Sequence, residues 1–150
     1  MKPLPEIYLA SASPRRRELL TQLGVCFEVL RVEVEECRAP QEVAAAYVTR
    51  LAGDKASAGW LACAGSRPVL GADTIVVVDG DVLEKPQDQA HAAAMMRRLS
   101  GRTHQVMTAV ALAHAGGIAV RRVVTDVTFR VVNEAEIAAY WQPGEPADKA

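Results

Sequence analysis

Short apolar blocks separated by polar turns open the chain. The apolar run at residues 7–10 predicts a strand. Ser13 and Pro14 follow as a preferred N-cap residue and a preferred first helical residue, so a helix is expected to begin there and to end at Gly24. A second strand is expected over residues 25–32. Three leucines fall on one side of the predicted helix and are expected to form its buried stripe: Leu19, Leu20 and Leu23.

The middle of the chain predicts a long helix followed by the most apolar strand. Residues 41 to about 61 are rich in alanine, and the apolar stripe of this predicted helix includes Leu51. Lys55 lies on the same side as that stripe. Residues 69–78 predict a strand, and the Asp79-Gly80 pair after them predicts a hairpin turn into a short strand at residues 82–83.

A helix, a strand pair and a final helix are predicted beyond that hairpin. Asp88 is expected to cap a helix that ends near residue 100, and residues 106–113 and 118–132 predict paired strands. Asn133 and Glu136 have capping-box spacing and predict the start of a last helix, which is expected to break at Pro143. Early strand–helix alternation followed by hairpins predicts a mixed α/β domain.

Composition narrows the classes of protein that fit this pattern. The chain has 150 residues, half of them apolar, which suffices for one domain with its own core. With 17 basic against 18 acidic residues and 5% aromatics, neither nucleic acid nor an anionic membrane is expected as a partner. No apolar run approaches the roughly 20 residues of a membrane span. Cys26, Cys37 and Cys63 fit no zinc-ligand spacing and are expected to be reduced thiols in a cytoplasmic protein.

Three consecutive arginines occupy the predicted first turn of the first helix. The N-terminus of a helix carries a positive partial charge, so Arg15, Arg16 and Arg17 are each unfavourable there by up to ~1 kcal/mol. A bound anion would offset this effect, because it would meet free backbone N–H groups and guanidinium groups together. Ser11 and Ser13 would add hydroxyl donors. The alternative is a solvated basic patch that binds nothing.

Asp73 interrupts the most apolar stretch of the chain. A carboxylate inside such a strand is unfavourable unless it is paired, hydrogen-bonded or bound to a metal, and such carboxylates are functional-site candidates. Alternatively, Asp73 lies at the end of the strand with its side chain in water. Lys55 is a weaker candidate, because lysines on the apolar side of a helix often extend to the solvent.

Two further charged segments each allow two interpretations. Glu33, Glu35 and Glu36 form an acidic loop that is either a magnesium site, since hard cations prefer carboxylate oxygens, or a solvated loop. Lys85, between Glu84 and a proline, is either a phosphate contact or part of a surface turn. Basic groups combined with isolated carboxylates favour a phosphate-ester site, in which cations bind phosphates while carboxylates hold a metal and orient water.

Several of these segments resemble the Maf family, in the family's order. They are LASASPRR at residues 9–16, GADT at 71–74, EKP at 84–86, LSG at 99–101 and EPADKA at 145–150. The resemblance covers essentially the whole chain, and the first two segments are highly specific. It implies an α/β fold like that of inosine triphosphate pyrophosphatases, with a mixed twisted sheet flanked by helices and two lobes around a cleft.

The resemblance also implies a reaction and a set of site residues. Maf proteins hydrolyse nucleoside triphosphates to the monophosphate and pyrophosphate with a divalent cation, here Mg²⁺ or Mn²⁺, and they are often dimers, so a homodimer is an expectation. By matching positions, Asp73 would be the general base that activates water, and Glu36 would help it to hold the metal. Six residues would contact the substrate: Ser11, Arg15, Arg16, Lys55, Thr74 and Lys85.

Two positions distinguish the branches of the family. The branch that acts on 7-methyl-GTP typically has Ser-Asp-Gln in place of Ala72-Asp73-Thr74, and it lacks a basic residue directly after the Ser-Pro pair. This chain is closer to the branch that acts on dTTP and UTP at both points, so a dTTP/UTP pyrophosphatase is expected. The alternatives are a pyrophosphatase for another or a modified nucleotide, such as 7-methyl-GTP, and a non-catalytic nucleotide-binding regulator of cell division.

The family pattern extends past the end of this sequence. Maf proteins continue for several tens of residues after the segment that matches residues 148–150. The sequence is therefore interpreted as a single Maf-like domain over residues 1–150 that lacks the family's C-terminal segment. If the protein ends there, lower stability, exposed strand edges and reduced or lost activity are expected.

Overall fold

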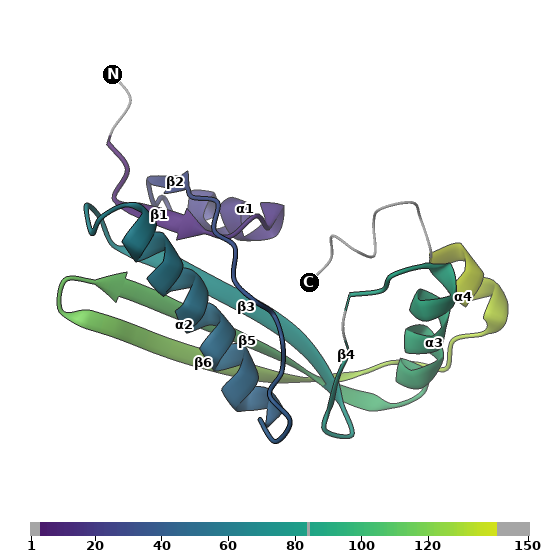
Figure 1. Ribbon diagram of the computed structural model, residues 1–150. Helices are drawn as coiled ribbons and strands as arrows, with labels where there is room; N and C mark the ends of the chain where they lie inside the picture. The colour runs from purple at the N-terminus through teal and green to yellow at the C-terminus, as the bar shows by residue number, and fades with distance from the viewer. Residues whose placement is uncertain (1–3, 84, 141–150) are drawn as a thin grey trace. The chain divides into compact units, whose positions relative to one another are not determined.

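The computed structural model describes residues 4–83 and 85–140 and has the expected mixed α/β architecture (Figure 1). Its elements in chain order are β1 (Ile7–Ala10), α1 (Pro14–Gln22), β2 (Phe27–Val29), α2 (Ala44–Ala62), β3 (Val69–Val78), β4 (Asp81–Leu83), α3 (Gln89–Leu99), β5 (Thr103–His114), β6 (Gly117–Thr128) and α4 (Glu134–Tyr140). The strands form one six-stranded sheet with the order β2-β1-β3-β5-β6, and β4 pairs with β3. β1 is parallel to β2 and β3, whereas β3 and β4 are antiparallel, so the sheet is mixed.

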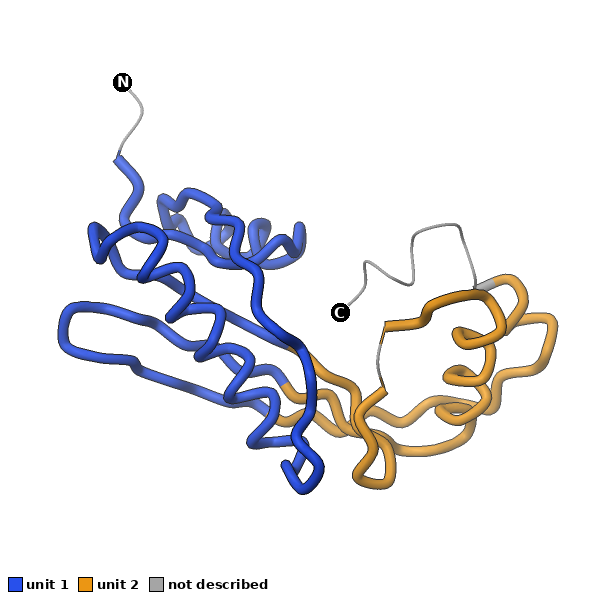
Figure 2. The backbone as a smooth tube through the Cα atoms, in the orientation of Figure 1, with its two compact units in different colours: residues 1–73, 108–123 blue, residues 74–107, 124–150 orange. Residues whose placement is uncertain are grey.

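The chain divides into two compact units (Figure 2). Unit 1 consists of Met1–Asp73 and Thr108–Val123, and it contains β1, α1, β2 and α2 with the first half of β3. Unit 2 consists of Thr74–Met107 and Val124–Ala150, and it contains β4, α3 and α4. Within unit 2, α3 contacts α4, and the Arg97 guanidinium donates to both carboxylate oxygens of Glu134 at 2.9 Å.

Two glycines allow α2 to pack very closely on the strands of unit 1. A β-carbon at Gly59 would lie 2.5 Å from the Cγ1 atom of Val69. A β-carbon at Gly71 would lie 2.5 Å from both the carbonyl oxygen of Ala52 and the amide nitrogen of Ala56. At Gly71 the neighbouring atoms belong to the helix backbone, so this distance between α2 and β3 requires a residue without a side chain. The predicted apolar stripe of α2 is buried at Val48, Leu51 and Ala52, and Ala56 is buried as well.

The local signals for helix starts and for the hairpin turn are confirmed. The Ser13 and Asp88 side chains cap α1 and α3 by accepting backbone N–H groups. Asn133 and Glu136 form a capping box, in which the Glu136 amide donates to Asn133 at 2.8 Å and the Asn133 amide donates to Glu136 at 3.4 Å. Asp79 and Gly80 both have positive φ, 51° and 80°, as a type I′ turn between β3 and β4 requires.

Two expectations from periodicity are wrong. The side of α1 that carries Leu19 and Leu23 is not a buried stripe, since these side chains are 48% and 76% exposed. Periodicity shows which residues share a helix face, but it does not show whether another element covers that face. The second strand is limited to Phe27–Val29 because it pairs in register only with the four-residue β1. The predicted helix break at Pro143 lies outside the described residues.

Candidate active site

Asp73 is buried on β3, on the strand face that α2 covers. Side chains alternate between the faces of a strand, so Asp73 shares its face with Gly71. Its residue exposure is only 9%, which excludes the alternative that its side chain lies in water at a strand end. Burial raises the pKa of Asp73, against the opposing effects of the nearby Lys55 and Arg16 cations, and the Glu36 carboxylate adds to the rise.

Lys55 joins two carboxylates that are far apart in the sequence. Its Nζ atom lies 2.9 Å from Oδ1 of Asp73 and 3.0 Å from Oε1 of Glu36. The Lys55 and Asp73 side chains are 16% and 13% exposed, whereas Glu36 is about half exposed. Lys55 therefore does not extend into solvent from the apolar side of α2. It forms the centre of a largely buried charge cluster that water reaches from the Glu36 side.

Ser11 and Arg16 form the edge of this cluster at the start of α1. Ser11 is buried directly after β1, and its Oγ atom accepts hydrogen bonds from Nη1 of Arg16 at 3.0 Å and from the Ser13 amide at 3.2 Å. Burial lowers the pKa of Arg16, and the carboxylates of Asp73 and Glu36 are near enough to oppose that effect. Arg16 therefore joins Ser11 to the charges of this cluster.

The structure does not bring all the predicted substrate contacts together. Arg15 lies in the first turn of α1 and is exposed. Thr74 follows Asp73 on β3 and is half-buried, and Lys85 is exposed after β4. Thr74 and Lys85 belong to unit 2, so only Ser11, Arg16, Glu36, Lys55 and Asp73 are seen as one constellation within unit 1.

The donor atoms of this constellation suit a hard divalent cation. Two carboxylates converge on a single ammonium group, so their oxygen atoms lie in one small region. Mg²⁺ commonly uses one or two carboxylates and completes its shell with water and phosphate oxygens. Within residues 4–83 and 85–140, no three His, Cys, Asp or Glu side chains gather into a metal-binding group. The two carboxylates that converge at Lys55 are those of Glu36 and Asp73.

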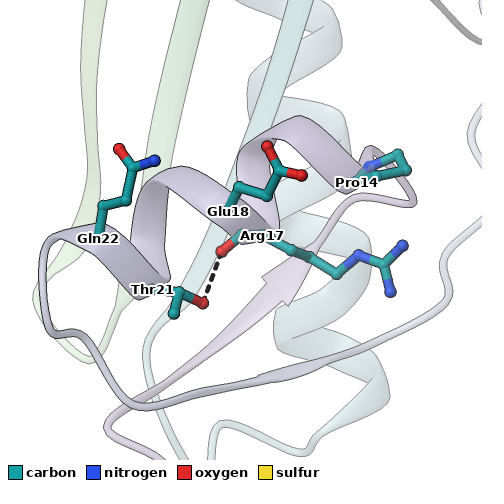
Figure 3. A pocket seen from close by; sticks show the side chains of 5 residues that line it. All are labelled: Pro14, Arg17, Glu18, Thr21 and Gln22. Atoms are coloured by element: carbon teal, nitrogen blue, oxygen red, sulfur yellow. Dashed lines mark hydrogen bonds between the residues drawn. The ribbon is translucent and has the colours of Figure 1, made fainter.

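A surface hollow of about 470 Å³ lies on α1, on a face other than the one that carries Arg16 (Figure 3). Its lining residues are Pro14, Arg17, Glu18, Thr21 and Gln22. Their helical spacing places them on one side of α1, roughly opposite Arg16. The Arg17 and Glu18 side chains extend in different directions in Figure 3. Because these two charged side chains do not converge, the cluster around Lys55 is the better candidate for chemistry.

Sequence reasoning missed the residues that hold the acidic loop. Arg50 on α2 binds Glu42 and the backbone carbonyl of Cys37, next to Glu36. Arg50 and Asp54 form an i, i+4 pair, and Glu42 lies about two helical turns before Arg50 in the sequence. These sequence separations could have indicated that Arg50 pairs with the two carboxylates, but surface ion pairs with such spacing are common and rarely functional.

Comparison with known proteins decides the family. The family model described as "Maf-like protein" matches residues 6–150 of the chain. The chain belongs to the Maf-like family. A "dTTP/UTP pyrophosphatase" of Escherichia coli O6:K15:H31 is 59% identical over 98% of this chain and 75% of that protein. A protein of the same name from Pectobacterium atrosepticum is 58% identical over the same shares.

A solved structure supports the fold of this Maf-like protein. A nucleoside-triphosphatase described as a "dITP/XTP pyrophosphatase" from Mycobacterium abscessus aligns with a TM-score of 0.56 and 19% identity, over 81% of this chain and 73% of that chain. At this identity the likeness shows a shared fold alone, and it agrees with the fold that the Maf resemblance implies. Cys26, Cys37 and Cys63 form no disulfide with one another. Among the described residues, no helix has the length and apolarity to cross a membrane.

Proposed function

We propose that this Maf-like protein is an enzyme that hydrolyses dTTP and UTP to the monophosphate and pyrophosphate. The relatives that share 58–59% identity with nearly the whole chain carry the name of that activity, which supports the choice of reaction and of bases. The observation that carries the proposal is the Lys55–Asp73 pair at 2.9 Å, because it places a buried carboxylate of raised pKa beside a cation. Such a pair suits a general base in a site for phosphates.

In the proposed reaction, Asp73 takes a proton from a water molecule as that water attacks the α-phosphorus. The bond between the α-phosphorus and the oxygen that bridges to the β-phosphorus then breaks, and pyrophosphate leaves with the electron pair. A carboxylate whose pKa is raised accepts a proton more readily while it is ionised. Lys55 opposes the rise in the pKa of Asp73, which favours the ionised carboxylate, and its ammonium group binds Oδ1 of that carboxylate.

The negative charge of the triphosphate has to be neutralised by groups beyond the Lys55–Asp73 pair. The cations of Arg16 and Lys55 are balanced by the carboxylates of Asp73 and Glu36, so the constellation by itself has no excess positive charge for a triphosphate. We propose that Glu36 and Asp73 hold Mg²⁺ or Mn²⁺, which would neutralise developing charge on the leaving group. Ser11, Arg15, Arg16 and the α1 N-terminus would bind the phosphates, and Thr74 and Lys85 are proposed as further contacts.

The test is pyrophosphate release from dTTP, UTP, CTP, GTP and 7-methyl-GTP, each with Mg²⁺, with Mn²⁺ and with a chelator. Selective, metal-dependent hydrolysis of dTTP and UTP is expected. Asp73→Asn is expected to abolish turnover while nucleotide affinity stays similar, because the amide keeps the shape of the carboxylate but cannot accept the proton. Asp81→Asn is the matched control, since Asp81 is 63% exposed and pairs with Arg98 within unit 2.

Each outcome separates the alternatives. Preferential hydrolysis of 7-methyl-GTP would replace the proposed base specificity. Nucleotide binding without release of pyrophosphate from any substrate would support a non-catalytic regulator. Full turnover by Asp73→Asn would refute the role of Asp73 but not the reaction. A homodimer in the cytoplasm stays a prediction, which gel filtration of the pure protein and cell fractionation would test.

A further inference from the structure

Glu36 lies in a segment that has no regular secondary structure. Between the end of β2 at Val29 and the start of α2 at Ala44, the chain forms neither helix nor strand. Such a segment lacks the backbone ladder that fixes side chains in a sheet or helix. The carboxylate of Glu36 nevertheless lies 3.0 Å from the Lys55 ammonium. Other contacts must therefore hold this segment against α2.

Arg50 supplies those contacts with its whole guanidinium group. Its Nε and Nη2 atoms lie 2.8 and 2.9 Å from the two carboxylate oxygens of Glu42, and Nη2 also donates to the carbonyl oxygen of Cys37 at 2.8 Å. Nη1 donates to Asp54 at 3.2 Å, and the guanidinium lies 5.5 Å from the ring centroid of the buried Tyr47. We call Arg50, Glu42 and the Cys37 carbonyl the loop clamp.

Glu42 connects the clamp to the rest of the loop. Its carboxylate accepts the Ala39 amide at 3.2 Å, and its backbone carbonyl accepts Nε of Arg38 at 2.7 Å. The hydrogen bond from Arg50 is the main cause that lowers the pKa of Glu42 to about 2. The clamp is therefore fully charged throughout the neutral range.

The loop clamp and Lys55 hold the loop at adjacent residues. Arg50 binds the backbone at Cys37, while Lys55 binds the side chain of Glu36. Both cations project from α2, so a single rigid helix fixes the backbone and the carboxylate at once. We propose that Arg50 is a positioning residue, which holds Glu36 in its place at the Lys55–Asp73 pair through the Cys37 carbonyl. This inference rests on the proposed function for its effect on turnover, but not for its effect on the loop.

The first test measures whether Arg50 acts through Glu36. Arg50→Met is expected to lower kcat/KM for dTTP about tenfold or more, the equivalent of roughly 1.4 kcal/mol, because Glu36 is no longer held in place. In a Glu36→Gln background the same change is expected to cost less than about threefold, since residues that act as a unit are not additive. Arg50→Lys is expected to restore little, because an ammonium group does not reproduce the planar guanidinium fork.

Hydrogen exchange tests the loop without relying on turnover. Arg50→Met is expected to speed amide exchange in residues 35–42 by about tenfold or more, while exchange in the C-terminal half of α2 is unchanged. Arg97→Met is the matched control, because it removes an exposed arginine that binds both oxygens of one glutamate in unit 2. It is expected to leave both the loop and kcat/KM as in the unmodified protein.

Three results would overturn the proposal. One is unchanged exchange in residues 35–42 in Arg50→Met. Another is that Arg50→Met lowers kcat/KM equally in the unmodified protein and in the Glu36→Gln background, which would mean that Arg50 acts independently of Glu36. The third is full recovery by Arg50→Lys, which would assign the effect to charge alone. If the unmodified protein hydrolyses no nucleotide, the proposed function fails, and the exchange result still decides whether the loop clamp exists.

Discussion

Gly71→Ala tests whether the close approach of α2 to β3 sets the geometry of the candidate site. The added methyl group would lie 2.5 Å from two backbone atoms of α2, the Ala52 carbonyl oxygen and the Ala56 amide nitrogen. Normal contacts of this kind are roughly 3.5 Å, so the helix must move away by about 1 Å. Lys55 lies between these two residues in the sequence, so the same movement draws its ammonium group away from Asp73.

The expected loss of stability follows from two opposing effects. Overpacking usually costs about 1–3 kcal/mol, and contact with backbone on two sides places this site near the upper value. Replacing glycine restricts the unfolded chain and returns roughly 0.5–1 kcal/mol. The net destabilisation is therefore about 2 kcal/mol, which for a protein of this length lowers Tm by roughly 4–8 °C. A displacement of about 1 Å at a catalytic group can reduce turnover by on the order of 100-fold.

Thermal unfolding and dTTP hydrolysis are measured together on three glycine variants. At Gly53 a β-carbon meets nothing within 4 Å, so Gly53→Ala in α2 is expected to be neutral or slightly stabilising. At Gly59 the nearest atom is the Val69 side chain, which can shift, so Gly59→Ala is expected to be intermediate. If Gly71→Ala keeps its Tm within about 1 °C of the parent and retains its activity, the close approach does not set the site geometry, and the reasoning is refuted.

Three further predictions concern charge and capping. Lys55→Met leaves the buried Asp73 carboxylate without the ammonium group that pairs with it. In urea unfolding this variant is expected to be less stable than the double variant Lys55→Met/Asp73→Asn, because the second change removes the unpaired buried charge. Burial lowers the pKa of His104, so the folded state binds fewer protons than the unfolded state, and stability is expected to fall as the pH drops from the ordinary value of 6.5 through the folded value. A His104→Leu variant should lose that part of the slope in a series of Tm measurements from neutral to acidic pH. Asp88→Ala removes the side-chain cap of α3 and is expected to lower the free energy of unfolding in urea by about 1 kcal/mol. Asp88→Ser is expected to keep most of the stabilisation, because serine is also a good N-cap residue.

The elements that could be predicted from the sequence are those that depend on local chemistry. The apolar run of β3, the Asp79-Gly80 turn and the capping residues before α1, α3 and α4 all act over a few residues. The burial of Leu19 and Leu23 depends instead on whether another element covers α1, and periodicity cannot show that. The same limit applies to the loop clamp, because its partners are brought together by the path of an irregular segment.

The candidate site shows why Lys55 was a weak candidate from the sequence and a central one in the structure. Its helical position predicts only that it points toward the sheet, and a lysine in that position ordinarily extends to water. What changes its role is the strand opposite. Gly71 brings the backbone of β3 against α2, and Asp73, two residues later on the same face, then meets Lys55 at 2.9 Å. A glycine two positions before a carboxylate in a buried strand therefore indicates, together with that carboxylate, a buried ion pair. The glycine sets the distance between strand and helix at which the carboxylate can be paired.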